Sequence, residues 1–342
     1  MARHRFRIRE IAQQSGLSEA TVDRALHRRP GVRESTVAEV ERAIADLERQ
    51  ESQLQVVGRT FLVDLVMQAP DRFSTQVRHA LETELPTLRP AVIRARFHLG
   101  EESSPAGAVH SLERIGERGS HGVILKAPDH PDVVAAVDRL VQSGTPVVTL
   151  VTDLPLSRRA AYIGIDNRAA GATAAYLVTQ WSTEAIGSVL VTLSSSTFRG
   201  EEEREMGFRT TLRNLAPDRT IREVTDTDGQ DGTILAAVGR AVRDDPTIDA
   251  VYSIGGGNAA ILDAFGDRAP RVFIAHDLDH DNARLLRTGR LSAVLHHDLR
   301  ADLRRACRML LQAQGALPGA ISTAPSQIQV VTPYNQPHAF GG

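Results

Sequence analysis

Two basic side chains in the interior of the sequence have the chemistry to bind a small polar ligand. Lys126, in ILKAPDH, is the only lysine in the chain and ends a short apolar stretch. Its compact ammonium suits an acidic sugar or a densely hydroxylated ring, although a salt bridge to an aspartate between two lobes accounts for it equally well. Arg204, in SSSTFRGEEEREMGF, offers a planar guanidinium that can hold two hydroxyls or one carboxylate, unless it lies on an exposed helix surface.

Other candidate ligand contacts also follow apolar stretches. Asp166, in IGIDNRAAG, and Asp277, in IAHDLD, each stand where an aspartate either accepts hydrogen bonds from a ligand or caps the next helix. The stretch MQAPDRFS follows the first apolar run, and its Gln68 and Arg72 can hydrogen-bond a ligand. Phe73 in the same stretch either offers its ring face to a sugar or fills the core.

Two histidine-rich stretches, HDLDHD from His276 and HHD from His296, raise the question of a metal site. Structural metal sites need converging ligands, often including cysteine, and the spacing here does not favour one. The sequence contains no GxSxG motif, no cysteine–histidine nucleophile pattern and no Walker A motif. SIGGGNAA lacks the spacing of a dinucleotide-binding loop. We therefore expect no metal, no cofactor and no enzymatic activity.

Apolar strand-like runs alternate with amphipathic helical stretches from Phe61 onward. The runs are FLVDLVM, AVIRARF, GVILK, PVVTLV and AYIGI, followed by SVLVTL, IREVT, AVYSI, VFIAH and SAVLH. This alternation is typical of doubly wound parallel sheets. Two blocks of about five strands predict an α/β protein with two lobes, in which a ligand binds between the lobes at the carboxyl ends of the strands.

The first 50 residues have a different character. Ile8 to Gly16 and Ser18 to Leu26 are typical of two short helices joined by a tight glycine turn, and a third helix starts at Ser35 or Thr36. Three helices in this arrangement predict a helix-turn-helix module. Eight arginines against three acidic residues between Met1 and Arg33 leave a surplus of five positive charges, which favours a phosphate-rich partner.

Composition limits the class of protein further. With 342 residues, 42% hydrophobic and 24% charged, the chain is typical of a globular protein with two or three folding units. The single cysteine, Cys307, excludes an intrachain disulfide and favours a reducing compartment. No apolar run follows the basic N-terminus, and none in the chain is long enough to cross a bilayer. We therefore expect a cytoplasmic protein without a membrane partner.

The N-terminal residues resemble the lactose-repressor (LacI) family of transcription regulators. The resemblance lies in Ile11-Ala12, Gly16-Leu17-Ser18, ATVDRAL, PGV and the following Thr36. The remaining chain looks like the family's effector domain, which shares its fold with periplasmic sugar-binding proteins. The implied domains are a helix-turn-helix headpiece at 1–50, a linker or hinge at 51–59 and an effector-binding domain at 60–342. The implied lobes are an N-lobe of about 60–163 plus 296–320 and a C-lobe of about 164–295 plus 321–334.

The resemblance also implies which residues contact DNA. Glu19 and Ala20 occupy the two specificity positions of the recognition helix, and Arg24 contacts a base or a phosphate. The other DNA-contacting positions are Ser18, Thr21, His27, Arg28, Arg29, Arg33 and Thr36. The family's hinge usually has a Tyr-x-Pro pattern and a leucine that enters the minor groove. Here LERQESQLQVVGRTF lacks that pattern, and Leu54 is the candidate for this leucine or covers a hydrophobic seam.

In the effector domain, Arg204 with Gly207 and Phe208 resembles the family's Arg-x-x-Gly-aromatic motif, whose arginine contacts the ligand. Asn258 matches a cleft asparagine, although Ala259 replaces the aspartate that normally follows it. Asp166 and Asp277 match positions that accept hydrogen bonds from sugar hydroxyls, and His297 matches a polar effector or hinge position. The effector contacts expected are Gln68, Arg72, Phe73, Lys126, Asp166, Arg204, Asn258, Asp277 and His297.

The resemblance therefore implies a DNA-binding regulator, in the first instance a repressor, of a carbohydrate-utilisation operon. It binds double-stranded operator DNA as a homodimer and responds to a sugar, polyol or sugar acid held between the lobes. Two other classes stay open: a solute-binding protein with the same two lobes, and a sugar-modifying enzyme. Neither of these two classes binds DNA to regulate transcription.

Overall fold

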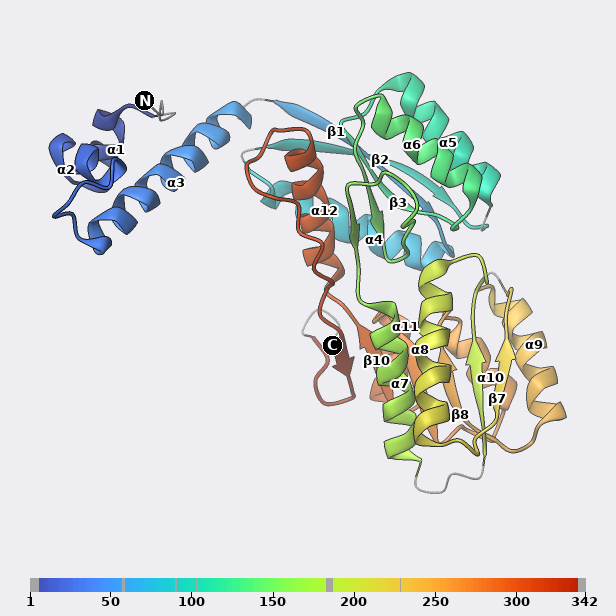
Figure 1. The fold of residues 1–342 in the computed structure, drawn as a ribbon. Helices are drawn as coiled ribbons and strands as arrows, with labels where there is room; N and C mark the ends of the chain where they lie inside the picture. Colours follow the sequence, from blue (N-terminus) through green and yellow to red (C-terminus); the bar gives the residue numbers. More distant parts are fainter. Residues whose placement is uncertain are drawn as a thin grey trace.

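Two mostly parallel sheets and a group of three N-terminal helices make up the fold (Figure 1). The computed structural model describes residues 6–56, 59–89, 91–102, 104–182, 187–227 and 229–337, apart from the side chains of residues 49 and 51–56. The predicted α/β architecture with two parallel sheets is confirmed.

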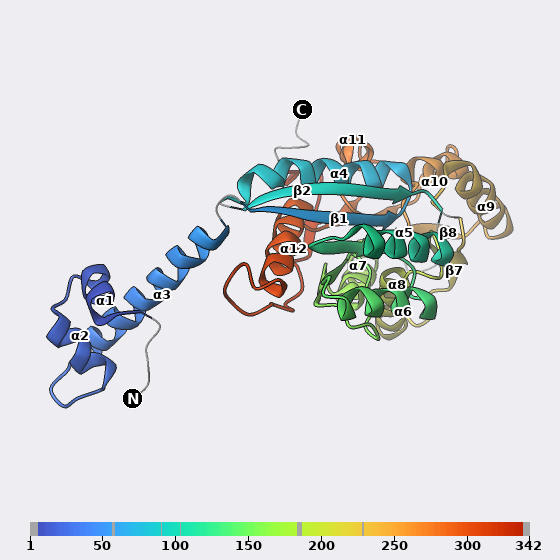
Figure 2. The same cartoon turned by 90° about the horizontal axis from the view of Figure 1, so that it is seen from above.

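The N-terminal helices are α1 (Ile8–Ser15), α2 (Glu19–Leu26) and α3 (Glu34–Val56). Gly16 ends α1 at a φ of 71°, a left-handed conformation that glycine adopts without strain. The helices share a small core of their own, formed by Ile11, Ala12, Val22, Ala25, Val40 and Ala43. They lie apart from both sheets in two perpendicular views (Figures 1 and 2). The third helix is longer than expected, because it continues to Val56 across most of the stretch expected to be a hinge.

The first sheet has the strand order β2-β1-β3-β4-β5, and all of its strands are parallel. Its strands are β1 (Thr60–Gln68), β2 (Val92–Gly100), β3 (Gly122–Lys126), β4 (Val147–Leu150) and β5 (Ala161–Ile163). The helices between them are α4 (Asp71–Glu84), the short 3-10 helix η1 (Leu85–Thr87), α5 (Pro105–Arg118) and α6 (Pro131–Gln142).

The second sheet has the order β11-β10-β9-β8-β6-β7, in which only β11 runs antiparallel to its neighbour. Its strands are β6 (Ser188–Thr192), β7 (Ile221–Val224), β8 (Ile248–Ser253), β9 (Val272–His276), β10 (Ala293–His296) and β11 (Gln329–Val331). The helices that accompany it are α7 (Asn167–Trp181), α8 (Arg199–Leu215), α9 (Asp231–Asp244), α10 (Asn258–Phe265) and α11 (His280–Arg287).

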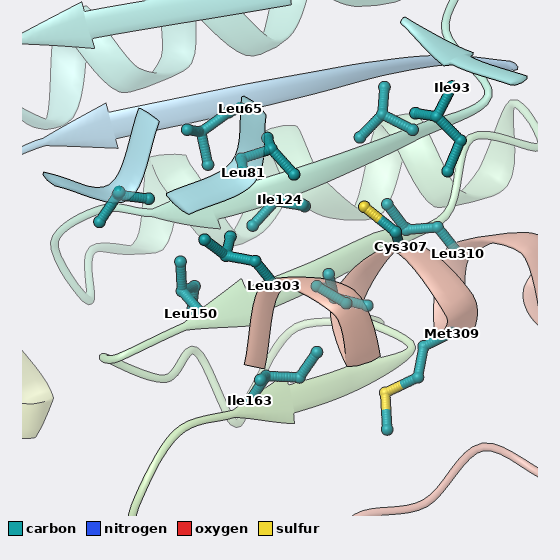
Figure 3. Packing of buried hydrophobic residues seen from close by; sticks show 14 of the residues in the cluster. Leu65, Leu81, Ile93, Ile124, Leu150, Ile163, Leu303, Cys307, Met309 and Leu310 are labelled. Carbon is teal, nitrogen blue, oxygen red and sulfur yellow. The ribbon is translucent and has the colours of Figure 1, made fainter. Parts of the chain in front are cut away.

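We call the first sheet with its helices the first lobe and the second sheet with its helices the second lobe. The chain passes between them after β5, after β10 and again before β11. The last helix, α12 (Leu299–Ala313), returns to the first lobe, where Leu303, Cys307 and Leu310 pack against strand residues such as Leu65 and Ile124 (Figure 3). The two lobes are thus tied together by three segments, which hold the carboxyl ends of their strands opposite one another.

Candidate functional site

A cavity of about 280 Å³ lies between the two lobes. Its lining comes from residues at or just after the ends of β1, β3 and β4 in the first lobe and of β6, β8 and β9 in the second. Parallel α/β proteins bind ligands at this edge of the sheet, because the loops after several strands meet there. The cavity has room for a small ligand only.

Arg204 lines this cavity from the first turns of α8 and is only 3% exposed. Its Nε donates a hydrogen bond of 2.8 Å to Oδ1 of Asn167, at the start of α7. Its Nη2 is buried and has no hydrogen-bond partner among the described residues. The position of α8 is fixed by close packing on α7, since a Cβ atom at Gly171 would collide with the carbonyl oxygen of Arg204. One at Gly207 would likewise collide with the backbone of α7.

Lys126 lines the same cavity at the end of β3 and is 7% exposed. Its ammonium donates to the carbonyl oxygen of Gln68 over 3.0 Å and lies 3.6 Å from the centre of the Phe198 ring. Burial lowers the pKa of Lys126 to about 8. The positive charge of Arg204 also lowers this pKa, whereas the negative charge of Glu201 raises it. The lysine is therefore a buried cation held mainly by neutral groups.

The side chains after β8 and β9 form a connected polar group on the second-lobe wall. Asn258 Nδ2 donates to Asn282 Oδ1 over 2.7 Å, while Asn258 Oδ1 is buried without a partner among the described residues. Nε2 of His276 lies 2.8 Å from the Tyr252 hydroxyl, and its Nδ1 is likewise buried without a partner in the described part of the chain. Burial, with the positive charge of Arg204, lowers the pKa of His276 well below its ordinary value, so the ring is neutral.

Two residues of α4 cross from the first lobe to the second at the edge of the cavity. Arg72 donates to the carbonyl oxygen of Gly229 over 3.1 Å and lies 3.4 Å from a carboxylate oxygen of Asp231. One turn further along α4, Gln76 Nε2 donates to the carbonyl oxygen of Leu278 over 2.8 Å. These contacts join the lobes at the loops before α9 and α11.

Six of the nine expected effector residues line the cavity: Arg72, Phe73, Lys126, Arg204, Asn258 and Asp277. The lining also includes His276 and Asn282, which were not among the expected effector contacts. His276 is the last residue of β9, so its position at the end of a strand was the available signal. Asn282 lies within α11, and nothing in the sequence distinguishes it from a surface residue of that helix.

Three expected effector residues lie outside the cavity lining. For Asp166 and His297 the structure agrees with the alternatives of a helix cap and a hinge position, whereas the expected position of Gln68 was wrong. Gln68 turns its side chain away from the cavity and exchanges hydrogen bonds of 2.5 and 3.0 Å with the backbone of Ser104. Asp166 caps α7 by accepting from the Ala169 amide over 2.9 Å. His297 is 2% exposed and lies 2.6 Å from Asp302 at the second crossing between the lobes.

The expected DNA-contacting residues gather on and around α2. Ser18 caps this helix by accepting from the Thr21 amide over 3.2 Å, and Glu19, Ala20 and Arg24 are exposed. Also exposed are His27, Arg28, Arg29 and Arg33, while Thr21 and Thr36 are half-buried. Asp23 partly offsets this positive charge, because Arg29 lies 3.5 Å from its carboxylate. The side chain of Leu54 lies outside the described residues, so its expected role stays a prediction.

The described residues contain no group of three or more histidine, cysteine, aspartate or glutamate side chains placed to hold a metal ion. In the same part of the chain, no helix has the length and apolar character needed to span a membrane.

Comparisons with known proteins match the two-lobed part of the chain. Residues 65–316 match the family described as "Periplasmic binding protein domain". The glucose-galactose binding protein GanP of Geobacillus stearothermophilus has a similar structure, with 18% identity, a TM-score of 0.72, and coverage of 82% of this chain and 99% of that chain. A solute binding protein of Burkholderia graminis, in complex with D-arabinose, has 20% identity and a TM-score of 0.72 and covers 81% of this chain and 96% of its own.

A carbohydrate transporter from Acidothermus cellulolyticus, in complex with myo-inositol, has 17% identity and a TM-score of 0.69 and covers 81% of this chain and 96% of its own. Curated protein sequences give no match. The family match begins after the three N-terminal helices and leaves them outside it. It covers well over half of the chain, and the chain therefore belongs to the periplasmic binding protein domain family.

Proposed function

We propose that the cavity between the lobes binds a small polyhydroxylated molecule of the sugar class. The observation that carries this proposal is a set of three buried atoms without partners in the described structure, namely Arg204 Nη2, Asn258 Oδ1 and His276 Nδ1. A buried polar atom left without a partner costs about 1–3 kcal/mol. Hydroxyl groups both donate and accept, so a sugar or polyol can supply partners to all three atoms.

The similar structures support the same class of ligand. Their names refer to glucose and galactose, to D-arabinose and to myo-inositol, and all three share the two-lobed fold. At 17–20% identity, these structures support only the fold of this chain. The proposed class of ligand therefore rests on the polar atoms of this cavity.

Thermal unfolding of the full chain with a panel of aldoses, polyols and sugar acids tests this proposal. A ligand present at a hundred times its Kd stabilises the folded state by about 2.7 kcal/mol, which raises the Tm measurably. Calorimetric titration of the stabilising compounds should show weaker binding to Asn258→Ala, which loses the cavity amide. Gln142→Ala, an exposed amide at the end of α6, is the matched control and should bind as the parent chain does. A panel without any stabilising compound would contradict the proposal.

We further propose that the three N-terminal helices bind operator DNA, as the resemblance to the LacI family implies. The observation in favour of this second function is a helical unit with its own core, outside the matched family region, that exposes Arg24, Arg28 and Arg33 beside α2. A helix of this kind fits the major groove, with its N-terminal side chains at the base edges. Regulation of a carbohydrate-utilisation operon, a homodimer and a cytoplasmic location belong to the same proposal.

The comparisons bear on the two-lobed region and support a solute-binding protein better than a regulator. A gel-shift experiment with promoter DNA of the neighbouring genes separates the two. A regulator gives a sequence-specific shift that weakens as salt rises, because phosphate contacts release counterions. A chain that shifts no DNA specifically at any salt concentration is a solute-binding protein, and the proposal for the helices then fails.

A regulator also requires that the ligand bind one arrangement of the lobes better than another. A tenfold change in operator affinity needs about 1.4 kcal/mol of such coupling. The gel shift repeated with a ligand identified by calorimetry measures this coupling directly.

A further inference from the structure

The cavity lining contains two buried cations that have no carboxylate partner among the described residues. Lys126 and Arg204 are 7% and 3% exposed, and both line the cavity. Among the described residues, no carboxylate oxygen lies within 4.0 Å of a side-chain nitrogen of either one. Glu201 and Asp277 are close enough to attract Lys126, but they do not form an ion pair with it.

The acidic side chains that line the cavity make their contacts elsewhere. Glu201 accepts hydrogen bonds from the Ser194 amide over 2.7 Å and from the Ser194 hydroxyl over 2.5 Å. Asp277 Oδ1 lies 3.7 Å from Nε2 of His297. The other acidic lining residues lie near the second-lobe loops: Asp231 pairs with Arg72, Asp279 caps α11, and Asp281 lies 3.5 Å from Arg284.

Neutral groups hold the two cations in place of carboxylates. Lys126 has one hydrogen bond, to the Gln68 carbonyl oxygen, and contacts the ring face of Phe198. Within the described residues, Arg204 Nε donates a hydrogen bond to Asn167, and Nη2 is buried without a partner. Buried charges are normally paired, since an uncompensated charge in a low-dielectric region is costly. The two positive charges also repel each other, which contributes to the low pKa of Lys126.

We propose that the natural ligand carries a carboxylate, which binds between Lys126 Nζ and Arg204 Nη2. This inference rests on the proposed sugar-class function and narrows it to sugar acids. A planar carboxylate has two acceptor oxygens, one for each of the two cations. The acidic residues nearer the second-lobe loops disfavour a ligand with two negative charges, so a carboxylate fits better than a phosphate.

The choice of lysine at position 126 agrees with this geometry. Of the 40 basic residues in the chain, 39 are arginine. The flexible lysine side chain places a compact point charge beside the Phe198 ring. An arginine guanidinium is planar and wider, and it presents several donors in a fixed geometry.

The experiment compares acids with their neutral parents at equal ionic strength. Calorimetric titration of the full chain uses glucuronate, galacturonate, gluconate and galactonate against glucose and galactose, with glucose 6-phosphate as the doubly charged probe. We expect at least one acid to bind about ten- to hundredfold more tightly than its parent sugar, the range given by one charged hydrogen bond. The phosphate should bind more weakly than the best acid.

The variant Lys126→Met keeps an unbranched side chain that is one atom shorter and removes its charge. It should lose the preference for the acid while it still binds the neutral parent sugar. Arg139→Met removes an exposed arginine from α6 in the same lobe and is the matched control that keeps the preference. Arg204→Lys, which keeps the charge but not the fork, gives a second readout if Lys126→Met does not fold.

The outcomes separate this inference from the function on which it rests. Neutral sugars that bind as tightly as every acid would overturn the carboxylate site and leave sugar binding intact. Tightest binding by glucose 6-phosphate would also overturn it. Binding by no member of the panel would count against the sugar-class function itself.

Discussion

The N-terminal helices and the cavity between the lobes differ in how their residues come together. On α2, the candidate contacts are neighbours in sequence and exposed, so one short helix presents Glu19, Ala20 and Arg24 at once. In the cavity, Lys126 and Arg204 come from different lobes and are almost completely buried. A contiguous exposed surface works by the side chains that it offers to a partner. In a buried site assembled from distant segments, the ligand is selected by the buried polar atoms that have no hydrogen-bond partner within the protein.

The sharpest test of this comparison removes a buried cation. Arg204→Met should weaken ligand binding by about 2–5 kcal/mol, or roughly thirtyfold or more, because a buried charge in the ligand loses its partner. DNA binding without ligand should be unchanged, since α8, which carries Arg204, lies far from α2 in sequence and structure (Figure 1). Calorimetry and gel shift measure the two effects on the same preparation. Equal loss of both would mean that the two regions are not separable.

A second test uses the pH dependence of stability. The pKa of Lys126 is lowered in the fold from 10.5 to about 8, so the charged lysine destabilises the folded state below pH 8. Between pH 8 and 10.5 the unfolded chain binds more protons, and stability rises with pH across this window. Lys126→Met lacks this dependence and should be more stable at pH 7 by up to about 3 kcal/mol. Denaturant unfolding at pH 7, 9 and 10.5 measures the difference, and a difference that grows with pH would contradict the buried cation.

The exposed region should give a smaller effect that is confined to DNA. Arg24→Ala should lower specific operator affinity by about 1–3 kcal/mol, the value of one base contact, and leave non-specific binding largely in place. Calorimetric ligand binding should not change. Arg42→Ala, an exposed arginine on α3, is the matched control. If both variants weakened binding equally on all DNA sequences, Arg24 would be a phosphate contact.

The smallest expected effect concerns the start of α2. Ser18→Ala removes the cap on the Thr21 amide and should cost about 1 kcal/mol of local helix stability. Hydrogen exchange of the α2 amides should speed up while exchange in the two sheets stays the same. Ser18→Asp preserves the cap and should restore protection. Faster exchange throughout the chain would mean that the helices and the lobes unfold together.

Much of the fold could be predicted from the alternation of apolar runs and amphipathic stretches. The ten expected strands are present. Most of them are buried, whereas β2 and β7, at the edges of their sheets, are largely half-buried or exposed. The strand β11 was missed, since it has three residues, two of them partly exposed, and pairs antiparallel at the edge of the second sheet. The length of α3 was left open, because the polar stretch ERQESQLQ is typical of either a linker or an exposed helix.

The site could be predicted where the end of a strand fixes a residue. Lys126 is the last residue of β3 and Asp277 follows β9 directly, so the topology brings them to the cavity. Gln68 also ends a strand, but its side chain points to Ser104, and the sequence does not reveal which way the last residue of a strand turns. Asn282 reaches the site through its hydrogen bond with Asn258, 24 positions away. Pairings of this kind depend on tertiary packing.

The tight contact between α7 and α8 has a consequence for how ligand preference can change. Because Gly171 and Gly207 leave no room for a side chain, the packing of α8 against α7 fixes the position of Arg204 in the cavity. A methyl group added at position 171 would displace the guanidinium without touching the ligand pocket. Selection for a new metabolite can therefore act through residues at the contact between α7 and α8, which a search confined to the cavity lining would overlook.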